Sequence, residues 1–249
     1  MLYACLSDQG RERPRNEDNL FVRAEGELAL FVVADGMGGH RAGNVASEMA
    51  VNAAARTWDS IDKSVLPDLK TSRKLLEDLI TEANLSIFDE ASARNSRQGM
   101  GTTLTAALVC GNRVTIGHVG DSRAYNIYNG TMTLLTKDHS LLEQLIEAGQ
   151  VQPDQAENHP QRHVLTRAIG ISPDLVADIV ELELEKGSSL ILCTDGLTNM
   201  VRDEEILAIH QQYGAPEEMV KALVDLANSR GGHDNITVVV VSDIGGPQL

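Results

Sequence analysis

Several features are scarce in this 249-residue chain, and each scarcity excludes a class of protein. Aromatic residues make up only 3% of the sequence, so the core has to be built mainly from Ala, Val, Leu and Ile. Lys and Arg number 21 against 36 Asp and Glu, and the net charge of −15 argues against nucleic-acid binding by phosphate neutralisation. The same acidic balance repels anionic membranes, and no apolar run approaches the roughly 18 residues of a membrane span.

Cysteine is also rare. Cys5, Cys110 and Cys193 lie in apolar runs without the Cys-x-x-Cys spacing of redox and zinc motifs. We expect buried, reduced thiols of a reducing compartment, and neither a disulfide framework nor a zinc site. No basic and then apolar leader opens the sequence. These absences favour a soluble, cytoplasmic protein, and the sequence leaves open whether it is part of a longer chain.

What the chain does have is a repeated pattern in which an apolar strand runs into an aspartate. Residues 31–34 lead into Asp35 and a turn with three glycines in four positions, and the same pattern precedes Asp121 and Asp195. Asp234 instead opens a valine-rich strand. A single Asp-Gly pair is more typical of a turn than of a ligand. Four carboxylates at strand ends, however, can converge at one end of a sheet core, where they would suit a hard cation such as Mg²⁺ or Mn²⁺.

Hydrophobic periodicity predicts a chain of mixed strands and helices. Strands are expected at residues 2–6, 20–22, 28–34, 103–110, 113–119, 123–128, 133–135, 176–182, 189–193 and 236–242. Helices are expected at residues 44–59, 72–95, 203–212 and 216–229, and Asp138 is the expected cap of a short helix that ends near residue 147.

Turn signals at Gly111-Asn112 and Asn129-Gly130 join neighbouring strands into hairpins. Such pairs are antiparallel, which excludes a doubly wound nucleotide-binding fold. No linker interrupts the chain, so we expect one domain over residues 1–249. The polar segment 149–173 shows little periodicity, as expected of a functional flap or lid inside that domain.

Six short motifs occur in the order of one known family. They are Arg13-Pro14-Arg15-Asn16-Glu17-Asp18, Val33-Ala34-Asp35-Gly36-Met37-Gly38-Gly39-His40, Gly101-Thr102-Thr103, Gly120-Asp121-Ser122-Arg123, Thr194-Asp195-Gly196-Leu197 and Asp234-Asn235-Ile236-Thr237. On these motifs the chain resembles the metal-dependent protein serine/threonine phosphatases of type 2C, in their compact bacterial form. The match runs from about residue 3 to 242, nearly the whole chain. Each motif is weak alone, but six in order make the resemblance strong.

The resemblance implies an α+β fold, a four-layer α-β-β-α sandwich of two antiparallel sheets flanked by helices. It also implies a centre of two or three divalent cations, Mn²⁺ or Mg²⁺, at one end of that sandwich. Asp35 would bridge two cations, and the carbonyl of Gly36 would bind one of them. Asp195 and Asp234 would hold the other.

Two further carboxylates complete the implied ligand set. Asp18, with Glu17 beside it, would bind the first cation directly or through its waters. Asp121, together with Asp195, matches the third and weaker metal position of the family. Acidic residues crowded in this way repel one another unless a cation holds them, so the assignment is physically consistent.

The remaining implied site residues would act on the substrate. Arg13 matches the phosphate-binding arginine of the family, although a lone arginine in a charged loop is usually solvated. Serine and threonine alkoxides are poor leaving groups, so a general acid is expected. His40 is the candidate, the alternative being a turn histidine that orders the loop. His163 lies in the expected flap, where it could contact substrate.

The implied reaction is hydrolysis of phosphoserine and phosphothreonine in proteins by a metal-activated water, without a phosphoenzyme intermediate. Cys5 and Arg11 have the Cys-x5-Arg spacing, but Cys5 lies within the expected strand 2–6, and the resemblance implies no cysteine nucleophile. The expected partners are substrates of a serine/threonine kinase, with no nucleic acid or membrane involved and a monomeric enzyme. A non-catalytic relative would have lost ligands that are present here. The alternative function, hydrolysis of small phosphomonoesters, stays open, because a two-metal centre contacts only the phosphate group of its substrate.

Overall fold

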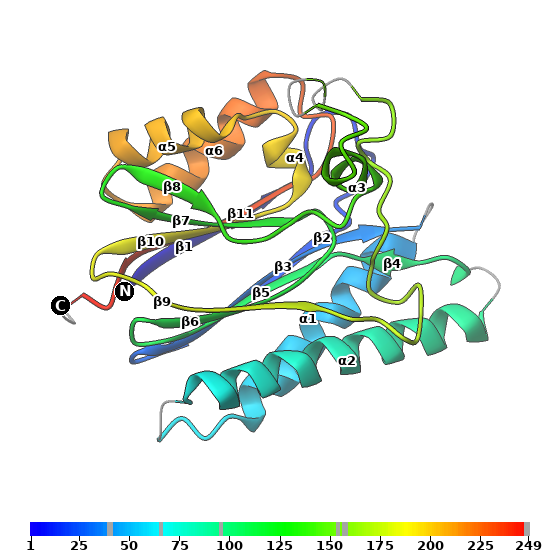
Figure 1. The fold of residues 1–249 in the computed structure, drawn as a ribbon, viewed down its shortest axis with the longest axis horizontal. Helices are drawn as coiled ribbons and strands as arrows, with labels where there is room; N and C mark the ends of the chain where they lie inside the picture. The colour runs from blue at the N-terminus through cyan, green and yellow to red at the C-terminus, as the bar shows by residue number, and fades with distance from the viewer. Residues whose placement is uncertain (39–41, 65–66, 95–96, 153–154, 156–158, 247–249) are drawn as a thin grey trace.

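Two antiparallel sheets lie face to face between helices in the computed structural model (Figure 1), which describes residues 1–38, 42–64, 67–94, 97–152, 155 and 159–246. The first sheet has the order β1 (Leu2–Asp8), β11 (Ile236–Ile244), β10 (Ser188–Cys193), β7 (Arg123–Tyr128) and β8 (Thr131–Leu134). The second has the order β2 (Asp18–Glu25), β3 (Leu28–Met37), β5 (Leu104–Cys110), β6 (Arg113–Val119) and β9 (Asp178–Glu183), and β4 (Gly101–Thr102) pairs with β3.

Helices cover the outer face of each sheet. The long helices α1 (Ala42–Ser60) and α2 (Leu69–Ala93) lie against the second sheet, and α5 (Asp203–Gln212) and α6 (Pro216–Ser229) lie over the first (Figure 1). The short helices α3 (Leu141–Glu147) and α4 (Asp195–Thr198) lie toward the right-hand end of the view. The predicted four-layer α-β-β-α sandwich is therefore confirmed.

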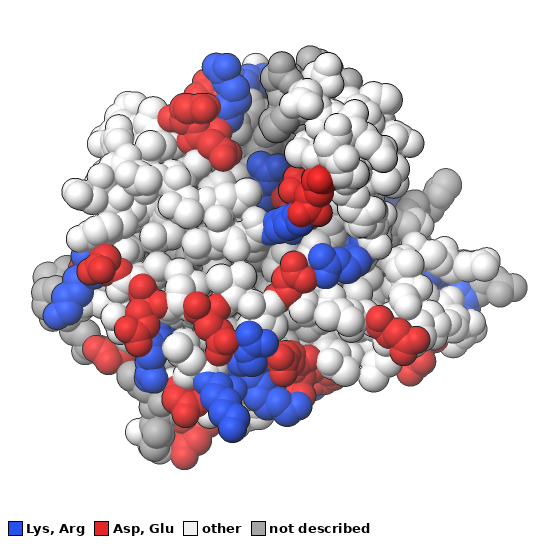
Figure 2. Space-filling view, viewed as in Figure 1, with Lys and Arg blue, Asp and Glu red and all other residues white. Residues whose placement is uncertain are grey.

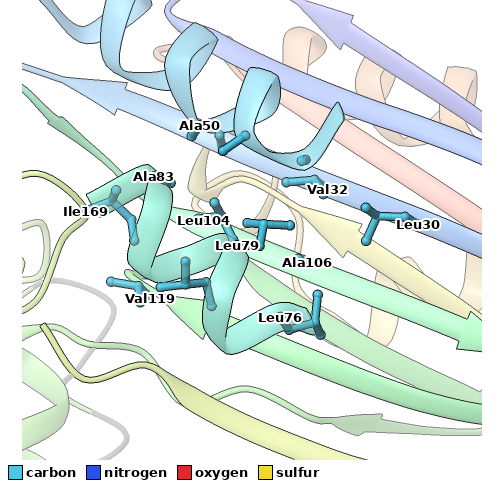
Figure 3. Close-up of a cluster of buried hydrophobic side chains, with 14 of the residues drawn as sticks. Leu30, Val32, Ala50, Leu76, Leu79, Ala83, Leu104, Ala106, Val119 and Ile169 are labelled. Atoms are coloured by element: carbon cyan, nitrogen blue, oxygen red, sulfur yellow. The ribbon is translucent and has the colours of Figure 1, made fainter. Parts of the chain in front are cut away.

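Three buried clusters fill the three gaps between the layers. Strand β3 shows how, because its side chains alternate between two of them. Leu30 and Val32 face helices α1 and α2 (Figure 3), whereas Phe31 and Val33 face the first sheet. Burial on both faces explains why this strand reads as an unbroken apolar run. The third cluster lies between the first sheet and helices α5 and α6.

Two sequence-based expectations are wrong in detail. Helix α3 begins at Leu141, and its N-cap is Ser140, whose hydroxyl accepts the N–H of Glu143 at 3.2 Å. Asp138 does not cap this helix; it accepts three hydrogen bonds from the guanidinium of Arg123, at 2.9, 3.3 and 2.7 Å. Cys5 is exposed, because it lies on the edge strand β1.

The expected flap, residues 149–173, is anchored along its second half. We call residues 164–173 the strap. Ile169 and Thr102 exchange two backbone hydrogen bonds, of 3.1 and 2.9 Å, and the Ile169 side chain is buried among α1, α2 and the second sheet (Figure 3). Asn84, on α2, accepts the N–H of Gly170 at 2.7 Å. Whether residues 149–163 act as a flap stays a prediction.

Charges of both signs are interspersed on the molecular face shown in Figure 2, most densely in its lower half, below β9 in Figure 1. Arg73 on α2 forms ion pairs with Glu77 and with Glu181 of β9. Such exposed pairs are screened by water and contribute little to stability. Among the helices that the structure describes, none combines the length and the apolar character that crossing a membrane requires.

Candidate active site

A cleft of about 1320 Å³ brings most of the predicted site residues together. Its lining includes, from distant parts of the chain, Arg13, Asp35, Gly36, Asp121, His163, Asp195 and Asp234. Asp18 lies beside this group, because it is the register partner of Asp35 across β2 and β3. His40 falls outside the described residues, so its predicted role as general acid has no structural counterpart here.

Asp35 stands near the end of β3, held by both of its backbone groups. Its N–H donates to the hydroxyl of Thr103 at 2.9 Å, and its carbonyl accepts the N–H of Thr103 at 2.8 Å. The next residue has to be glycine, since a Cβ on Gly36 would lie 2.2 Å from the carbonyl oxygen of Gly43 in α1. The glycine therefore allows the first turn of α1 to approach the end of β3 closely.

Asp18 has a buried carboxylate that is shared between the two sheets. Asp18 is 5% exposed, and its Oδ2 accepts hydrogen bonds from the hydroxyls of Thr194 at 2.9 Å and Thr237 at 2.7 Å. Asp18 lies on β2 of the second sheet, whereas Thr194 follows β10 and Thr237 lies on β11 of the first. Its Oδ1 is buried and has no hydrogen-bond partner.

Asp195 opens α4, directly after the buried strand β10. Its Oδ2 accepts the side-chain amide of Asn199 at 3.0 Å, one helical turn away, and its Oδ1 is buried without a partner. His163 Nδ1 lies 4.0 Å from Asp195 Oδ2. Because His163 Nε2 accepts a hydrogen bond from Arg162 at 2.8 Å, the ring proton is on Nδ1, toward Asp195.

Asp234 lies two residues before β11 and is fixed by its neighbours. Its Oδ1 accepts the N–H of Asn235 at 2.8 Å, and its Oδ2 accepts Arg13 Nη2 at 2.7 Å. Asn235 also ties the N-terminal loop to this corner, since its side-chain amide donates to the carbonyls of Gln9 and Arg15, at 2.8 and 2.9 Å. Arg13 is thereby brought over the carboxylate group.

Asp121 is connected to the strap through three side chains. The N–H of Gly120 donates to His139 Nδ1 at 3.1 Å, so His139 carries its proton on Nε2, 3.1 Å from Asp178 Oδ2. The other carboxylate oxygen of Asp178 accepts Arg167 Nη1 at 2.7 Å. Arg167 belongs to the strap and lines the cleft. This chain of contacts holds the Asp121 turn and the strap in one arrangement.

The electrostatics of the carboxylates are those of a functional site. Burial raises the pKa of Asp18 to about 7, opposed by the two threonine hydrogen bonds and reinforced by repulsion from Asp195. Burial, then repulsion from Asp18, raises the pKa of Asp35 well above its usual range, and burial does the same for Asp121. Burial and the negative charge of Asp234 also raise the pKa of Asp195. Such crowded, destabilised carboxylates are typical of ion-binding and catalytic sites.

These residues fit divalent cations. Asp18 Oδ1 and Asp195 Oδ1 are buried carboxyl oxygens without hydrogen-bond partners, and Gly36 belongs to the cleft lining. Within the described ranges, no three Asp, Glu, His or Cys side chains are arranged to hold an ion by themselves. Main-chain oxygens and water would therefore complete the coordination, as is usual for Mg²⁺.

Sequence reasoning missed several residues that the cleft contains. Thr103 bonds the backbone of Asp35, Asn199 orients Asp195, and Arg162 and Arg167 stand on the flap side of the cleft. The spacing of Asn199, four residues after Asp195 at a helix start, was a usable signal. The two arginines had none, because the flap shows no periodicity.

Comparison with known proteins identifies the family. Residues 10–232 match the family model described as protein phosphatase 2C. A serine/threonine phosphatase named stp, from Listeria innocua, is 40% identical over 236 residues, covering 94% of this chain and 93% of that protein. The crystal structure of the serine/threonine phosphatase Stp1 from Staphylococcus aureus has a TM-score of 0.91 at 32% identity, covering 99% of this chain and 96% of that one.

A second solved structure adds a metal. The catalytic domain of the serine/threonine protein phosphatase PstP, in complex with two manganese ions, has a TM-score of 0.83 and is 36% identical. That likeness covers 97% of this chain and 96% of the other. The chain belongs to the protein phosphatase 2C family of serine/threonine phosphatases, in its bacterial form.

Proposed function

We propose that this chain hydrolyses phosphoserine and phosphothreonine in proteins at a centre of divalent cations held by Asp35, Asp195 and Asp234. The observation that carries the proposal is the pair of buried, unpartnered oxygens on Asp18 and Asp195. Asp195 lines the cleft together with Arg13, and Asp18 is the register partner of Asp35, which also lines it. The manganese in the PstP structure supports the same kind of centre.

The ligands have distinct tasks in this proposal. Asp35 and the Gly36 carbonyl, at the end of β3, would share the cations with Asp195 and Asp234, while Asp18 supports the first ion and Asp121 a third, weaker one. When bound, two cations lower the pKa of a shared water and screen the charge that develops on phosphorus. We propose two or three bound ions, which are either Mn²⁺ or Mg²⁺.

The substrate phosphate would be oriented by side chains on the walls of the cleft. Arg13 presents a planar guanidinium that can donate to two phosphate oxygens while it stays beside Asp234. His163, with its Nδ1 proton toward Asp195, would donate to a phosphate oxygen on that side. His40 is proposed to protonate the leaving alkoxide.

No cysteine takes part in this reaction. Cys110 and Cys193 are buried, and Cys5 lies on the outer edge strand, so none of the three lines the cleft. Burial raises the pKa of Cys193 to about 12, which leaves its thiol without nucleophilic character. We therefore propose direct attack by water and no phosphoenzyme.

The size of the cleft favours protein substrates. Pockets for small molecules usually occupy about 300–1,000 Å³. The cleft here is larger, about 1320 Å³, and its walls include apolar strap residues such as Leu165 and Ile171. A polypeptide segment around a phosphorylated residue would fill it better than a small phosphomonoester. The kinase partner, the monomeric state and the cytoplasmic location remain predictions from the sequence.

The test is phosphate release from a phosphothreonyl peptide with Mn²⁺, with and without chelator, for the wild type and for Asp195→Asn. A sugar phosphate serves as the competing substrate. We expect peptide turnover that needs the metal and collapses in the variant. Turnover that survives chelator and mutation would place the site elsewhere. Faster turnover of the sugar phosphate would overturn the substrate class, and manganese binding without any turnover would indicate a binding module.

A further inference from the structure

A closed ring of hydrogen bonds surrounds Asp18, one of the proposed ligands. The N–H of Asp18 donates to Asn16 Oδ1 at 3.1 Å, and Asn16 Nδ2 donates to Ser7 Oγ at 2.8 Å. Ser7 Oγ lies 2.8 Å from Thr237 Oγ1, which lies 2.7 Å from Asp18 Oδ2. Outside the ring, Thr194 Oγ1 lies 2.9 Å from the same Oδ2.

The direction of every bond in this ring is determined. The backbone N–H of Asp18 can only donate, so the Asn16 oxygen faces it and the Asn16 amide faces Ser7. Thr237 has one hydroxyl proton, which it gives to the carboxylate of Asp18, so Ser7 has to donate to Thr237. Thr194 Oγ1 accepts the N–H of Thr237 at 2.9 Å, and it donates its own proton to Asp18 Oδ2, because a carboxylate oxygen can only accept.

The hydroxyls of Thr194 and Thr237 both donate to Asp18 Oδ2, and this leaves Oδ1 as the oxygen that can bind a cation. A proton on Oδ2 would collide with both hydroxyl hydrogens, so Oδ2 stays an acceptor. Oδ1 is left buried without a hydrogen-bond partner, so it is the oxygen available to a cation. The carboxylate cannot turn without breaking both bonds, so Oδ1 keeps one orientation. A ligand atom fixed in this way is pre-organised for a cation.

We propose that Thr194 and Thr237, with Ser7 as the donor behind Thr237, are positioning residues that set the affinity of the centre for divalent cations by aiming Asp18 Oδ1. This inference rests on the proposed metal centre. It adds residues from the first sheet to a ligand that belongs to the second. None of the three side chains lines the cleft, so they act through Asp18 and not on the substrate.

The decisive variants replace the hydroxyl by a methyl group of the same size. We expect Thr237→Val and Thr194→Val each to raise the manganese dissociation constant about 10–100-fold, the usual effect of removing an outer-shell partner. Thr237→Ser and Thr194→Ser keep the donor and should restore most of the affinity. Isothermal titration calorimetry of the chelator-stripped chain with Mn²⁺ measures all of these without any substrate.

Thr115→Val is the matched control. Thr115 is a buried strand threonine, 1% exposed, whose hydroxyl has no hydrogen-bond partner. Its replacement tests the cost of a valine in the sheet without touching Asp18. We expect wild-type manganese affinity from it. An affinity loss as large as that of Thr237→Val would show that any change in the sheets weakens the centre, and would overturn the inference.

Ser7→Ala tests the ring even if the valine variants fail to fold. Removing the Ser7 donor frees Thr237 to turn away from Asp18, so the manganese affinity should fall severalfold. In a Thr237→Val background, the same change should have a smaller effect, because only the contact of Ser7 with Asn16 is then left to lose. Equal affinities of the wild type, Ser7→Ala and whichever valine variants fold would overturn the positioning role. A wild type that binds no manganese would instead defeat the proposed metal centre.

Discussion

Arg13 Nη2 and Asp234 Oδ2 are joined by a hydrogen bond of 2.7 Å, although the two residues lie 221 positions apart in the chain. The Arg13 side chain remains 52% exposed, so one edge of its guanidinium holds Asp234 and another stays accessible from the cleft. We therefore expect the same group to position a proposed metal ligand and, as proposed above, to bind the phosphate.

Replacing Arg13 by lysine tests this double role. A single ammonium cannot match the planar fork, so we expect Arg13→Lys to lower kcat/KM for a phosphopeptide about 10–100-fold, as loss of a charged hydrogen bond predicts. Arg15→Lys is the control, since Arg15 lines the same cleft and matches no functional position of the family. Steady-state kinetics that move equally in both variants would contradict the assignment.

A bridge of contacts links Gly120 to the strap through His139, Asp178 and Arg167. It predicts the effect of a second substitution. Asp178→Asn cannot accept from both His139 and Arg167 as a carboxylate does, so the strap should loosen. We expect faster backbone hydrogen exchange at Thr166, whose N–H donates to the His139 carbonyl at 2.8 Å, and about tenfold lower kcat/KM. Asp174→Asn, an exposed change in the next segment, should alter neither. Unchanged exchange at Thr166 would refute the bridge.

The buried side chain of His118 should make the free energy of unfolding depend on pH. Burial, with His139 nearby, lowers the pKa of His118 to about 4, from 6.5 in the unfolded chain. The unfolded chain therefore binds more protons between these values. The stability that neutral His118 contributes is complete above pH 6.5 and is lost as the pH falls toward 4.

His118→Gln removes that term, because glutamine does not titrate. The advantage of the wild type over the variant in free energy of unfolding should shrink by about 2 kcal/mol between pH 7 and pH 5. Urea unfolding of both proteins at the two pH values measures it, and the shared carboxylates cancel in the difference. A difference that stays constant with pH would mean that His118 has the same pKa in the folded and the unfolded chain.

The buried carboxylates around Asp18 predict the opposite pH dependence: the stability of the metal-free protein should fall as the pH rises. The pKa of Asp18 is raised to about 7 in the fold, so its burial costs least at low pH, and stability falls as the pH rises through that value. A bound cation replaces the protons. We expect Mn²⁺ to raise Tm more at pH 8 than at pH 6, and chelator-treated Asp195→Asn to melt above the chelator-treated wild type. Scanning calorimetry would contradict this if the variant melted lower.

Local signals made much of the fold predictable. Strands β6 and β7 and helices α5 and α6 have the predicted bounds, because clear periodicity ends at strong turn or capping residues. Asn129 and Gly130, for example, have φ of 51° and 76°, as a two-residue hairpin turn requires. The aspartates at strand ends were visible for the same reason.

Contacts between distant segments were not predictable. Asp138 looks like a helix cap in sequence, but the nearby strand offers it the guanidinium of Arg123, a stronger partner than a backbone N–H. Thr237 stands in a quoted motif, yet its partner Asp18 is 219 residues away, and nothing local indicates the pairing. The strap has no pattern of its own because it is held by Thr102 and Asn84.

The placement of Asp18 between the sheets also bears on how the chain is made. Its Oδ2 accepts hydroxyls that follow β10 and lie on β11, and β1 pairs only with β11 among the described strands. During synthesis, β1 and Asp18 can therefore contact their partners only after nearly the whole chain has emerged from the ribosome. A nascent chain without β11 has an incomplete acidic cluster. The proposed metal centre can therefore be completed only when translation has passed β11.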